Sequence, residues 1–309
     1  MNASKTFIIV NPAAARGKTR TRWAQLEGVL RAAGIHFDSA LTQAPGHATE
    51  LAAQAEQQGY DMVACMGGDG TLNEVVNGLM ASAAPPALAI IPCGTGSDFA
   101  RALKLPHTPP DIVHLLQHGT PQAIDVGLVS CQHAGKVSQR HFINIAGVGF
   151  DGDVSEQMNR SSKRGGSLAY FANVFKVLGR YQNKRVAVYI KTAEGEQFIE
   201  GKFNSIVIAN GQYFGGGMWV APQASWCDGL FDVVLIGDVS RAEFVATFPR
   251  IYRGTHLTHP KVKLLRATEV RIEPHPHEHA LLQAEGELFG AAPATVRMLP
   301  LALQVLGLR

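Results

Sequence analysis

The first hundred residues alternate short apolar runs with longer amphipathic stretches, and this alternation constrains the fold more than any other feature of the chain. The apolar runs are rich in β-branched residues, which is typical of buried strands. The longer stretches carry apolar side chains at helical spacing. The predicted strands are 6–10, 36–41, 61–66 and 87–91. The first predicted helix ends at residue 34, and the others cover 46–58, 71–80 and 97–103. Repeated strand–helix units with short connections predict an α/β domain with a mostly parallel sheet.

After about residue 128 the chain changes to short strands separated by turn residues. The expected strands are 185–191, 204–209, 229–236 and 262–272, and the expected helices lie near 168–178 and 241–252. This pattern predicts a β-rich domain, a sandwich in its simplest form. We therefore expect an α/β domain over residues 1–128 and a β-rich domain over 129–298. The last segment, 299–309, fits either domain and could pack back on the first.

The composition is that of a globular protein, with 46% hydrophobic and 17% charged residues, which excludes a disordered or collagen-like chain. The net charge of +3 identifies no partner, and nothing indicates nucleic acid. The four cysteines are far apart and form no CxxC pair, so we expect buried free thiols in a reducing cytosol. No secretory segment is expected before the first strand, and no apolar run approaches the ~18 residues that span a bilayer. These features favour a cytoplasmic protein, which would meet a membrane, if at all, from the water side.

The strongest local signal is the block Gly67-Gly68-Asp69-Gly70-Thr71-Leu72-Asn73-Glu74, where a predicted strand ends and a helix begins. Glycines let backbone N–H groups point into such a turn, and the helix N-terminus adds partial positive charge, which suits a phosphate. Thr71 and Glu74 have the spacing of a capping box that fixes the helix start. The alternative is an ordinary glycine-rich turn. However, Asp69 would repel a phosphate there unless it binds Mg²⁺ or handles a proton.

Two further turns of this kind are expected at the same edge of the sheet. One is Gly94-Thr95-Gly96-Ser97-Asp98, after the fourth strand, and the other is Asn11-Pro12, followed by Gly17 and Lys18, after the first. Carboxyl ends of neighbouring parallel strands meet at one edge, where open α/β folds bind ligands. Neither the dinucleotide fingerprint nor the P-loop pattern occurs at these junctions, which argues against both of those sites.

Taken together, these motifs resemble the diacylglycerol kinase catalytic family, which includes bacterial soluble lipid kinases. The resemblance covers essentially the whole chain and rests on Asn11-Pro12 with Gly17, Gly67–Glu74, Gly94–Arg101, Asp125–Gly127, Asn144–Asp151, Asn210-Gly211 with Gly215–Gly217, and Asp228–Asp232. It implies a Rossmann-like N-terminal domain with a parallel sheet, a C-terminal β-sandwich domain that binds lipid, and an ATP cleft between them. The implied activity is ATP-dependent phosphorylation of a hydroxyl of diacylglycerol or a similar lipid at a membrane surface.

The resemblance also implies which residues bind the nucleotide and its metal. The implied ATP contacts are Asn11, Thr42, Gly67, Gly68, Asp69, Gly70, Thr71, Leu72, Asn73 and Thr95. Asp69 and Asp98 would lie near the phosphates and their Mg²⁺, and Asp125 resembles a carboxylate that supports the same network. Asp228 matches a position where some bacterial members hold a structural divalent ion, and the alternative is a turn residue before a strand.

The chain departs from the family's pattern at two places. Ser97 stands where the second block usually has Asn, and Ser can still cap a helix. Glu285-Gly286-Glu287 stands where members carry Asp-Gly-Glu, whose first carboxylate is the candidate general base for the lipid hydroxyl. Glu is one methylene longer, and a shift of about 1 Å can cost on the order of 100-fold in rate. The expected catalytic residues are Glu285 and Glu287, and Asp69 would be the general base if Glu285 is not. The alternative is that Glu285 and Glu287 are surface carboxylates in a hairpin.

Local charge points to a membrane partner. Seven basic residues and one acid lie between 154 and 185, and a second basic run consists of Arg16, Lys18, Arg20 and Arg22. Either run could attract phosphates or an anionic bilayer, and the alternative is a solvated helix face. We expect a lipid substrate and peripheral contact with the inner face of the membrane, while a homodimer stays open. His275, His277 and His279 alternate as metal ligands can, but two prolines break the run.

Two other functions are compatible with these motifs. One is an NAD kinase, from a related family that shares the Gly67–Thr71 turn. The Gly94–Arg101 block and the Asp228–Asp232 segment favour a lipid kinase over it. The other is a nucleotide or lipid sensor without catalysis, in which Glu285 would mark lost chemistry.

Overall fold

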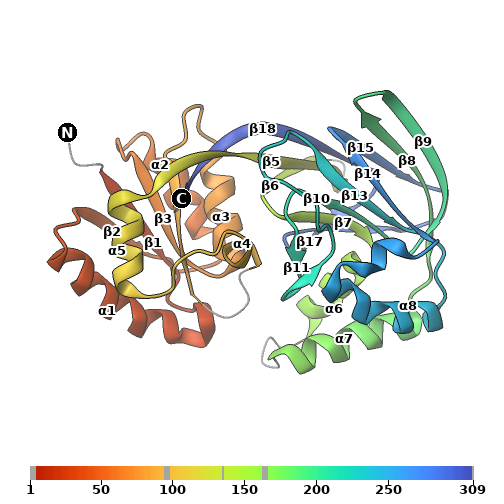
Figure 1. Cartoon of the computed structure of the whole chain (residues 1–309), viewed down its shortest axis with the longest axis horizontal. Coiled ribbons are helices and arrows are strands. Elements are labelled where there is room, and N and C mark those ends of the chain that lie inside the picture. Colours follow the sequence, from red (N-terminus) through yellow and green to blue (C-terminus); the bar gives the residue numbers. More distant parts are fainter. Residues whose placement is uncertain (1–4, 94–97, 134–135, 162–165, 308–309) are drawn as a thin grey trace. The chain divides into compact units, whose positions relative to one another are not determined.

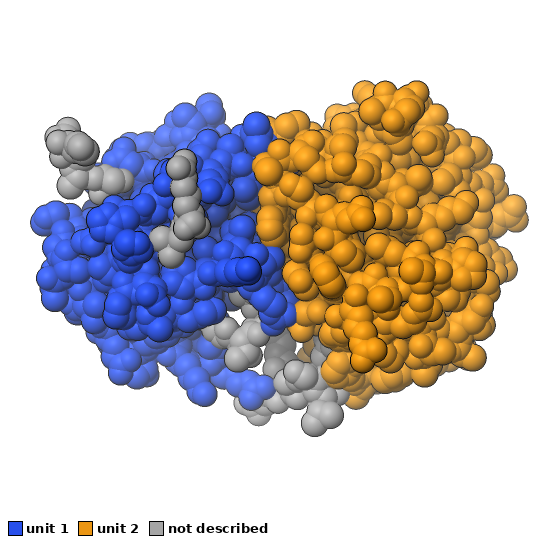
Figure 2. Space-filling model, in the orientation of Figure 1, with its two compact units in different colours: residues 1–125, 301–309 blue, residues 126–300 orange. Residues whose placement is uncertain are grey.

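The computed structural model describes residues 5–93, 98–133, 136–161 and 166–307. The chain divides into two compact units, coloured blue and orange in Figure 2. The first consists of residues 1–125 and 301–309, and the second of residues 126–300. The chain therefore leaves the first unit after Asp125 and returns to it at Leu301.

The first unit is a parallel sheet with helices, in the strand order β2-β1-β3-β4 followed by the last part of β18. Its strands are β1 (Thr6–Val10), β2 (Phe37–Leu41), β3 (Met62–Gly67) and β4 (Ala87–Pro92) (Figure 1). Its helices are α1 (Lys18–Ala32), α2 (His47–Ala55), α3 (Asp69–Leu79), α4 (Asp98–Ala102) and α5 (Pro109–His118), with a 3-10 turn at Ala14–Gly17. The strands β1, β3 and β4 are buried along almost their whole length because they are continuous apolar runs.

The second unit contains two antiparallel layers. One has the order β14-β13-β10-β7-β16-β17, and the other contains β15, β8 and β9 together with β5, β6 and the first part of β18. The strands are β5 (Thr120–His133), β6 (Lys136–Phe142), β7 (Ile145–Gly149), β8 (Lys184–Thr192), β9 (Gly195–Phe203), β10 (Ser205–Ala209), β13 (Phe231–Ile236), β14 (Val262–Ala267), β15 (Glu269–Pro274), β16 (Leu281–Ala284), β17 (Glu287–Ala291) and β18 (Ala294–Gly307). A short hairpin pairs β11 (Tyr213–Phe214) with β12 (Met218–Trp219).

Alternate residues of both layers form one hydrophobic core, as a sandwich requires. Val186, Val188 and Ile190 of β8 meet Val233 and Leu235 of β13 in the same buried cluster. Three helices, α6 (Phe150–Arg160), α7 (Gly166–Arg180) and α8 (Arg241–Thr247), form a smaller apolar cluster with the 3-10 segment Phe248–Arg253. A further 3-10 turn covers Thr255–Thr258. The predicted fold class, a parallel α/β domain followed by a β-sandwich, is confirmed.

Several local predictions need correction. The helices α5 and α6 were not predicted, and the helix expected over 241–252 ends at Thr247 and continues as 3-10, with Pro249 in that second part. Cys65, Cys93 and Cys131 are buried as expected, but Cys227 is exposed. In the described part of the chain, no helix is both long enough and apolar enough to cross a membrane.

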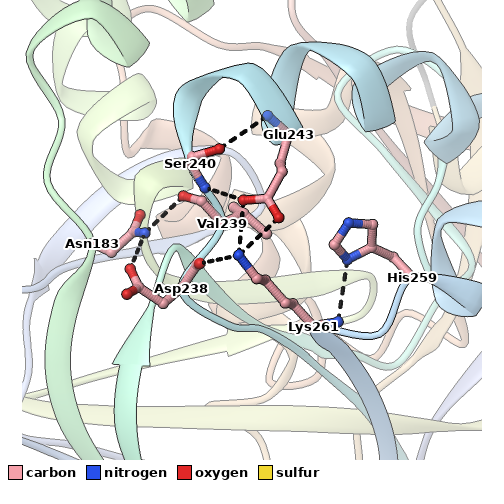
Figure 3. A network of polar contacts seen from close by, with 7 residues as sticks. All are labelled: Asn183, Asp238, Val239, Ser240, Glu243, His259 and Lys261. Atoms are coloured by element: carbon pink, nitrogen blue, oxygen red, sulfur yellow. Dashed lines mark hydrogen bonds and ion pairs between the residues drawn. The ribbon is translucent and has the colours of Figure 1, made fainter.

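The N-terminus of α8 is held by a polar network, shown in Figure 3. Ser240 and Glu243 form a capping box, in which each side chain accepts the other's backbone N–H. The Lys261 ammonium lies 2.8 Å from the Glu243 carboxylate and also donates to the Asp238 carbonyl. Hydrogen bonds from Lys261 and Ser240 lower the pKa of Glu243 from its usual 4.5 to about 2.

This network makes a prediction about acid stability. Because the folded pKa of Glu243 is depressed, its contribution is complete above pH 4.5 and is lost as the pH falls towards about 2. We expect Glu243→Gln to lower the urea midpoint at pH 7 and to have a progressively smaller effect between pH 4.5 and 2. Urea unfolding at four pH values measures this, with Glu196→Gln, an exposed carboxylate of β9, as the control. An effect of Glu243→Gln that is constant with pH would contradict the prediction.

Candidate active site

The carboxyl ends of four parallel strands in the first unit are aligned by backbone hydrogen bonds. The Asn11 N–H donates to the Met66 carbonyl at 2.9 Å, and the Thr42 N–H donates to the Val10 carbonyl at 2.8 Å. The Cys93 N–H donates to the Gly67 carbonyl at 3.0 Å. These bonds place Asn11, Thr42 and the Gly67-Gly68 turn along one edge of the sheet, where ligands bind in open α/β folds.

Three of the predicted nucleotide residues are in direct contact at this edge. The Asn11 Nδ2 donates to the Thr71 Oγ1 at 2.8 Å, and the Asn11 Oδ1 accepts the Ala13 N–H at 3.0 Å. A Cβ added at Gly67 would lie only 2.6 Å from the Thr71 Cβ, so Thr71 requires a glycine at that position. The side chain of Thr71 thus contacts both the first residue after β1, Asn11, and the last residue of β3, Gly67.

The start of α3 differs from the predicted capping box. Gly68, in extended backbone, is the N-cap, and α3 begins at Asp69 without a side-chain cap. The Thr71 hydroxyl accepts from Asn11, and the Glu74 carboxylate accepts the Ala48 N–H at the N-terminus of α2, at 3.2 Å. The spacing of Thr71 and Glu74 predicted hydrogen bonds between these two neighbours. In the structure each side chain instead binds a residue that is distant in the sequence. The predicted capping box is wrong.

The other predicted residues of the block lie in the first turns of α3. Asp69 and Gly70 open the helix, whereas Leu72 and Asn73 are buried, with 4% and 6% of their surface exposed. Leu72 thus packs inside the unit as an apolar side chain. Thr95 falls outside the described residues.

Asp98 and Asp125, predicted near the metal, are both buried and both bonded. The Asp98 Oδ1 lies 3.1 Å from the Arg101 guanidinium, one turn along α4. The Asp125 Oδ1 accepts the Leu301 N–H at 2.8 Å, which ties the point where the chain leaves the first unit to the point where it returns. Arg22, from the second basic run, donates to the carbonyls of Pro92 and His107, so it holds the end of β4.

No three His, Cys, Asp or Glu side chains among the described residues meet as a metal cluster. Mg²⁺ is usually held by one or two carboxylates together with substrate phosphates, so Asp69 at a glycine turn fits a nucleotide-bound Mg²⁺. Asp228 fits a divalent ion less well, because the guanidinium of Arg266 already binds it and lies 3.5 Å from Asp232. His275 is paired with Glu200 at 2.8 Å.

In the second unit, Glu285 occupies a tight turn between β16 and β17, with a positive φ of 55°. Its Oε1 accepts the backbone N–H groups of Ile143 and Asn144, at 2.7 and 2.8 Å. The Asn144 carbonyl in turn accepts the N–H groups of Asn210 and Gly211, both at 2.9 Å. The motifs at 144 and 210 thus converge on the turn that carries Glu285. Glu287, the other predicted carboxylate, is more exposed and pairs with Arg140 at 3.4 Å.

A second layer of buried polar groups, which sequence reasoning did not assign, supports this turn. The Gln283 Oε1 accepts the Gly286 N–H at 2.8 Å, and its Nε2 donates to the Asp151 Oδ2 at 3.2 Å. The hydroxyl of Ser205 donates to the other oxygen of Asp151. Burial raises the pKa of Asp151, and the bonds from Ser205 and Gln283 oppose this rise. The sequence signal for this layer was Gln283, a polar residue within an apolar strand, and the structure shows that only 1% of its surface is exposed.

The contact between Gly67 and Thr71 gives a stability prediction. Gly67→Ala places a methyl group 2.6 Å from the Thr71 Cβ, and overpacking of this kind costs about 1–3 kcal/mol. Gly68→Ala is the matched control, because nothing lies within 4 Å of a Cβ there and φ is −102°. We expect urea unfolding to show the loss for Gly67→Ala and a change below about 0.5 kcal/mol for Gly68→Ala. At Gly68 the loss of a glycine N-cap and the lower entropy of the unfolded chain oppose each other. Equal losses would show that the close approach is not the cause.

Comparison with known proteins assigns the two halves of the chain to two family models. Residues 5–129 match the diacylglycerol kinase catalytic domain, and residues 144–307 match the YegS C-terminal NAD kinase beta sandwich-like domain. A diacylglycerol kinase of Bacillus subtilis is 31% identical over 290 residues, covering 93% of this chain and 90% of the relative. One from Mycobacterium tuberculosis strain H37Rv is 30% identical over 261 residues, covering 84% and 81%.

Solved structures show the same fold. A putative diacylglycerol kinase from Bacillus anthracis superposes with a TM-score of 0.76 at 23% identity, over 99% of this chain and 98% of that one. Yeast NADH kinase in complex with NADH superposes with a TM-score of 0.57 at 10% identity, covering 100% and 85%.

Proposed function

Because the chain belongs to the diacylglycerol kinase catalytic-domain family, we propose that it transfers the γ-phosphoryl group of ATP to a hydroxyl of diacylglycerol or a similar lipid. The observation that carries this proposal is the Glu285 carboxylate, whose Oε1 is held by two backbone amides at 2.7 and 2.8 Å. A carboxylate fixed in this way is suited to accept the proton of an attacking hydroxyl. A carboxylate that accepts the proton of the substrate hydroxyl is a recurring part of kinases with alcohol acceptors.

The nucleotide would bind at the Gly67–Thr71 turn. Backbone N–H groups at the start of α3 suit the phosphate oxygens, and the Asn11–Thr71 hydrogen bond keeps the turn in place. The Asp69 carboxylate, at the first position of the helix, would hold the Mg²⁺ that accompanies the phosphates. When bound, Mg²⁺ neutralises charge on the phosphoryl groups.

Glu285 would then take the proton from the lipid hydroxyl as that oxygen attacks the γ-phosphorus in line. The bond from the γ-phosphorus to the β–γ bridging oxygen would break, and ADP would leave with that oxygen. One carboxylate oxygen is committed to the amides of Ile143 and Asn144, which orients the carboxylate plane. Gln283 fixes the following peptide through the Gly286 N–H.

The second candidate function is phosphorylation of NAD, and the observation that favours it is the fold shared with yeast NADH kinase. The full-length similarity to bacterial diacylglycerol kinases supports the lipid as acceptor instead. We also propose that the protein works in the cytoplasm, as a peripheral protein at the inner face of the membrane.

The test is transfer of label from γ-labelled ATP in the presence of Mg²⁺. The acceptors are diacylglycerol and related lipids in uncharged mixed micelles, with NAD in a parallel reaction and the Asp69→Ala protein as the control. We expect a labelled lipid that is absent with the control. Labelled NAD, or ATP binding without turnover on any acceptor, would overturn the proposal in favour of an NAD kinase or a sensor.

A further inference from the structure

Three elements of the second unit, α7, α8 and the 3-10 segment 248–253, share one buried apolar cluster and also carry exposed apolar side chains. Figure 1 shows where these elements lie in the chain. Phe175 of α7 is 47% exposed, Val245 of α8 is 48% exposed, and Tyr252 is 38% exposed. They are three of the eight large apolar side chains that are exposed in the described part of the chain. Phe175 lies one helical turn after Phe171, and Val245 lies one turn before Phe248, so the exposed side chains extend from adjoining turns of elements that pack together. Apolar exposure concentrated in this way is uncommon on a surface that faces only water.

One of these side chains, Tyr252, packs against a group of aromatic rings. The Phe248 ring lies 5.4 Å from Phe244, 6.1 Å from Tyr252 and 6.3 Å from Phe171 of α7, measured between ring centroids. Phe244 in turn contacts the buried ring of Phe150 at 4.9 Å. Phe248 therefore joins α7 to the 3-10 segment, and Tyr252 is held at the surface by its ring contact with Phe248.

The same elements are strongly basic. Segments 166–180 and 241–253 together contain one acid and five basic residues, namely Lys176, Arg180, Arg241, Arg250 and Arg253. The acid, Glu243, is already bound to Lys261 at 2.8 Å. Lys176 follows Phe175 directly, and Arg253 follows Tyr252, so exposed cations flank the exposed apolar side chains.

We propose that this aromatic–basic surface, centred on Phe175, Val245 and Tyr252, docks on an anionic lipid bilayer. Aromatic and aliphatic side chains enter the boundary between headgroups and acyl chains, while neighbouring Lys and Arg bind anionic headgroups. A second copy of the chain fits less well, because a two-fold contact would bring these cations against their own equivalents. The choice of a bilayer as occupant rests on the proposed lipid kinase function.

The test measures binding to sedimented vesicles of phosphatidylcholine, with and without 30% phosphatidylglycerol. We expect Phe175→Ser/Val245→Ser to weaken binding about 10-fold or more to the anionic vesicles. Lys176→Glu/Arg253→Glu should weaken binding to anionic vesicles at least about fivefold per charge and leave binding to neutral vesicles unchanged. Phe198→Ser, a 56% exposed aromatic of β9, is the matched control and should bind like the wild type.

Activity in uncharged mixed micelles separates this inference from the proposed function. If the variants lose vesicle binding but keep activity in micelles, both the docking surface and the lipid kinase function are supported. If no lipid is phosphorylated in any assay, the kinase proposal fails, and the vesicle-binding result still tests the docking surface by itself. Wild-type vesicle binding by both double variants would overturn the proposal. So would a wild-type dimer in light scattering that becomes a monomer in Phe175→Ser/Val245→Ser, since the surface would then join two copies.

Discussion

Glu285→Gln should lower kcat for lipid phosphorylation by about 10²- to 10⁴-fold, the range that a general base contributes. Gln keeps an Oε1 that can accept the Ile143 and Asn144 amides, so the turn should retain its shape and only the proton-accepting charge is lost. KM for ATP should stay within about twofold, because the change is confined to the second unit. Steady-state kinetics in mixed micelles provides the measurement.

Two further variants make this result specific. Gln283→Met removes the bond to the Gly286 N–H and leaves Glu285 in place, so we expect a smaller loss, about 10-fold, from a less well-fixed carboxylate. Glu273→Gln, a half-exposed carboxylate of β15 near Arg271, should have no effect. If Glu285→Gln is as active as the wild type, the proton acceptor is another group, and Asp69 becomes the first candidate.

Asp69→Asn should reduce kcat/KM by about 10²- to 10³-fold, and the Mg²⁺ concentration at half-maximal activity should rise. Asn has nearly the same size, and removing a charge from the first turn of a helix costs only about 0.3–1 kcal/mol of stability. The effect should therefore lie in the chemistry and not in the fold. Asp61→Asn is the matched control, because Asp61 precedes the opposite end of β3, where it accepts the Lys5 N–H at 2.8 Å. A variant at Asp69 with an unchanged Mg²⁺ requirement would exclude it as the metal-binding carboxylate.

The sheet of the first unit was predictable because its strands are contiguous apolar runs, which report burial directly. The helix α5 was missed although its start has a recognisable signature: Thr108 caps it by accepting the Asp111 N–H, and two prolines occupy the first positions. The helix α6 was missed because glycine and aspartate at 151–153 resemble a turn, whereas Phe150 and Val154 at helical spacing bury one face.

The site was predictable only where its contacts follow from strand order. Asn11, Thr42 and the turn after β3 share an edge because parallel strands end together. The partners of Glu74, Asp125 and Glu285 lie 26, 176 and about 141 residues away in the sequence, so no local pattern could reveal them. For these residues the sequence pattern marked a polar side chain as noteworthy but did not reveal the group that it binds.

The return of the chain at Leu301 has a consequence for synthesis on the ribosome. The strand β18 pairs with β4 through Val305 and Leu88, and it completes the sheet of the first unit 176 residues after the chain has left that unit at Asp125. Until then, β4 presents an unpaired edge, which is a template for association with other chains. The sheet of the first unit therefore stays incomplete until the whole second unit has been synthesised. A fragment that ends near residue 125 should aggregate under conditions in which the full chain does not.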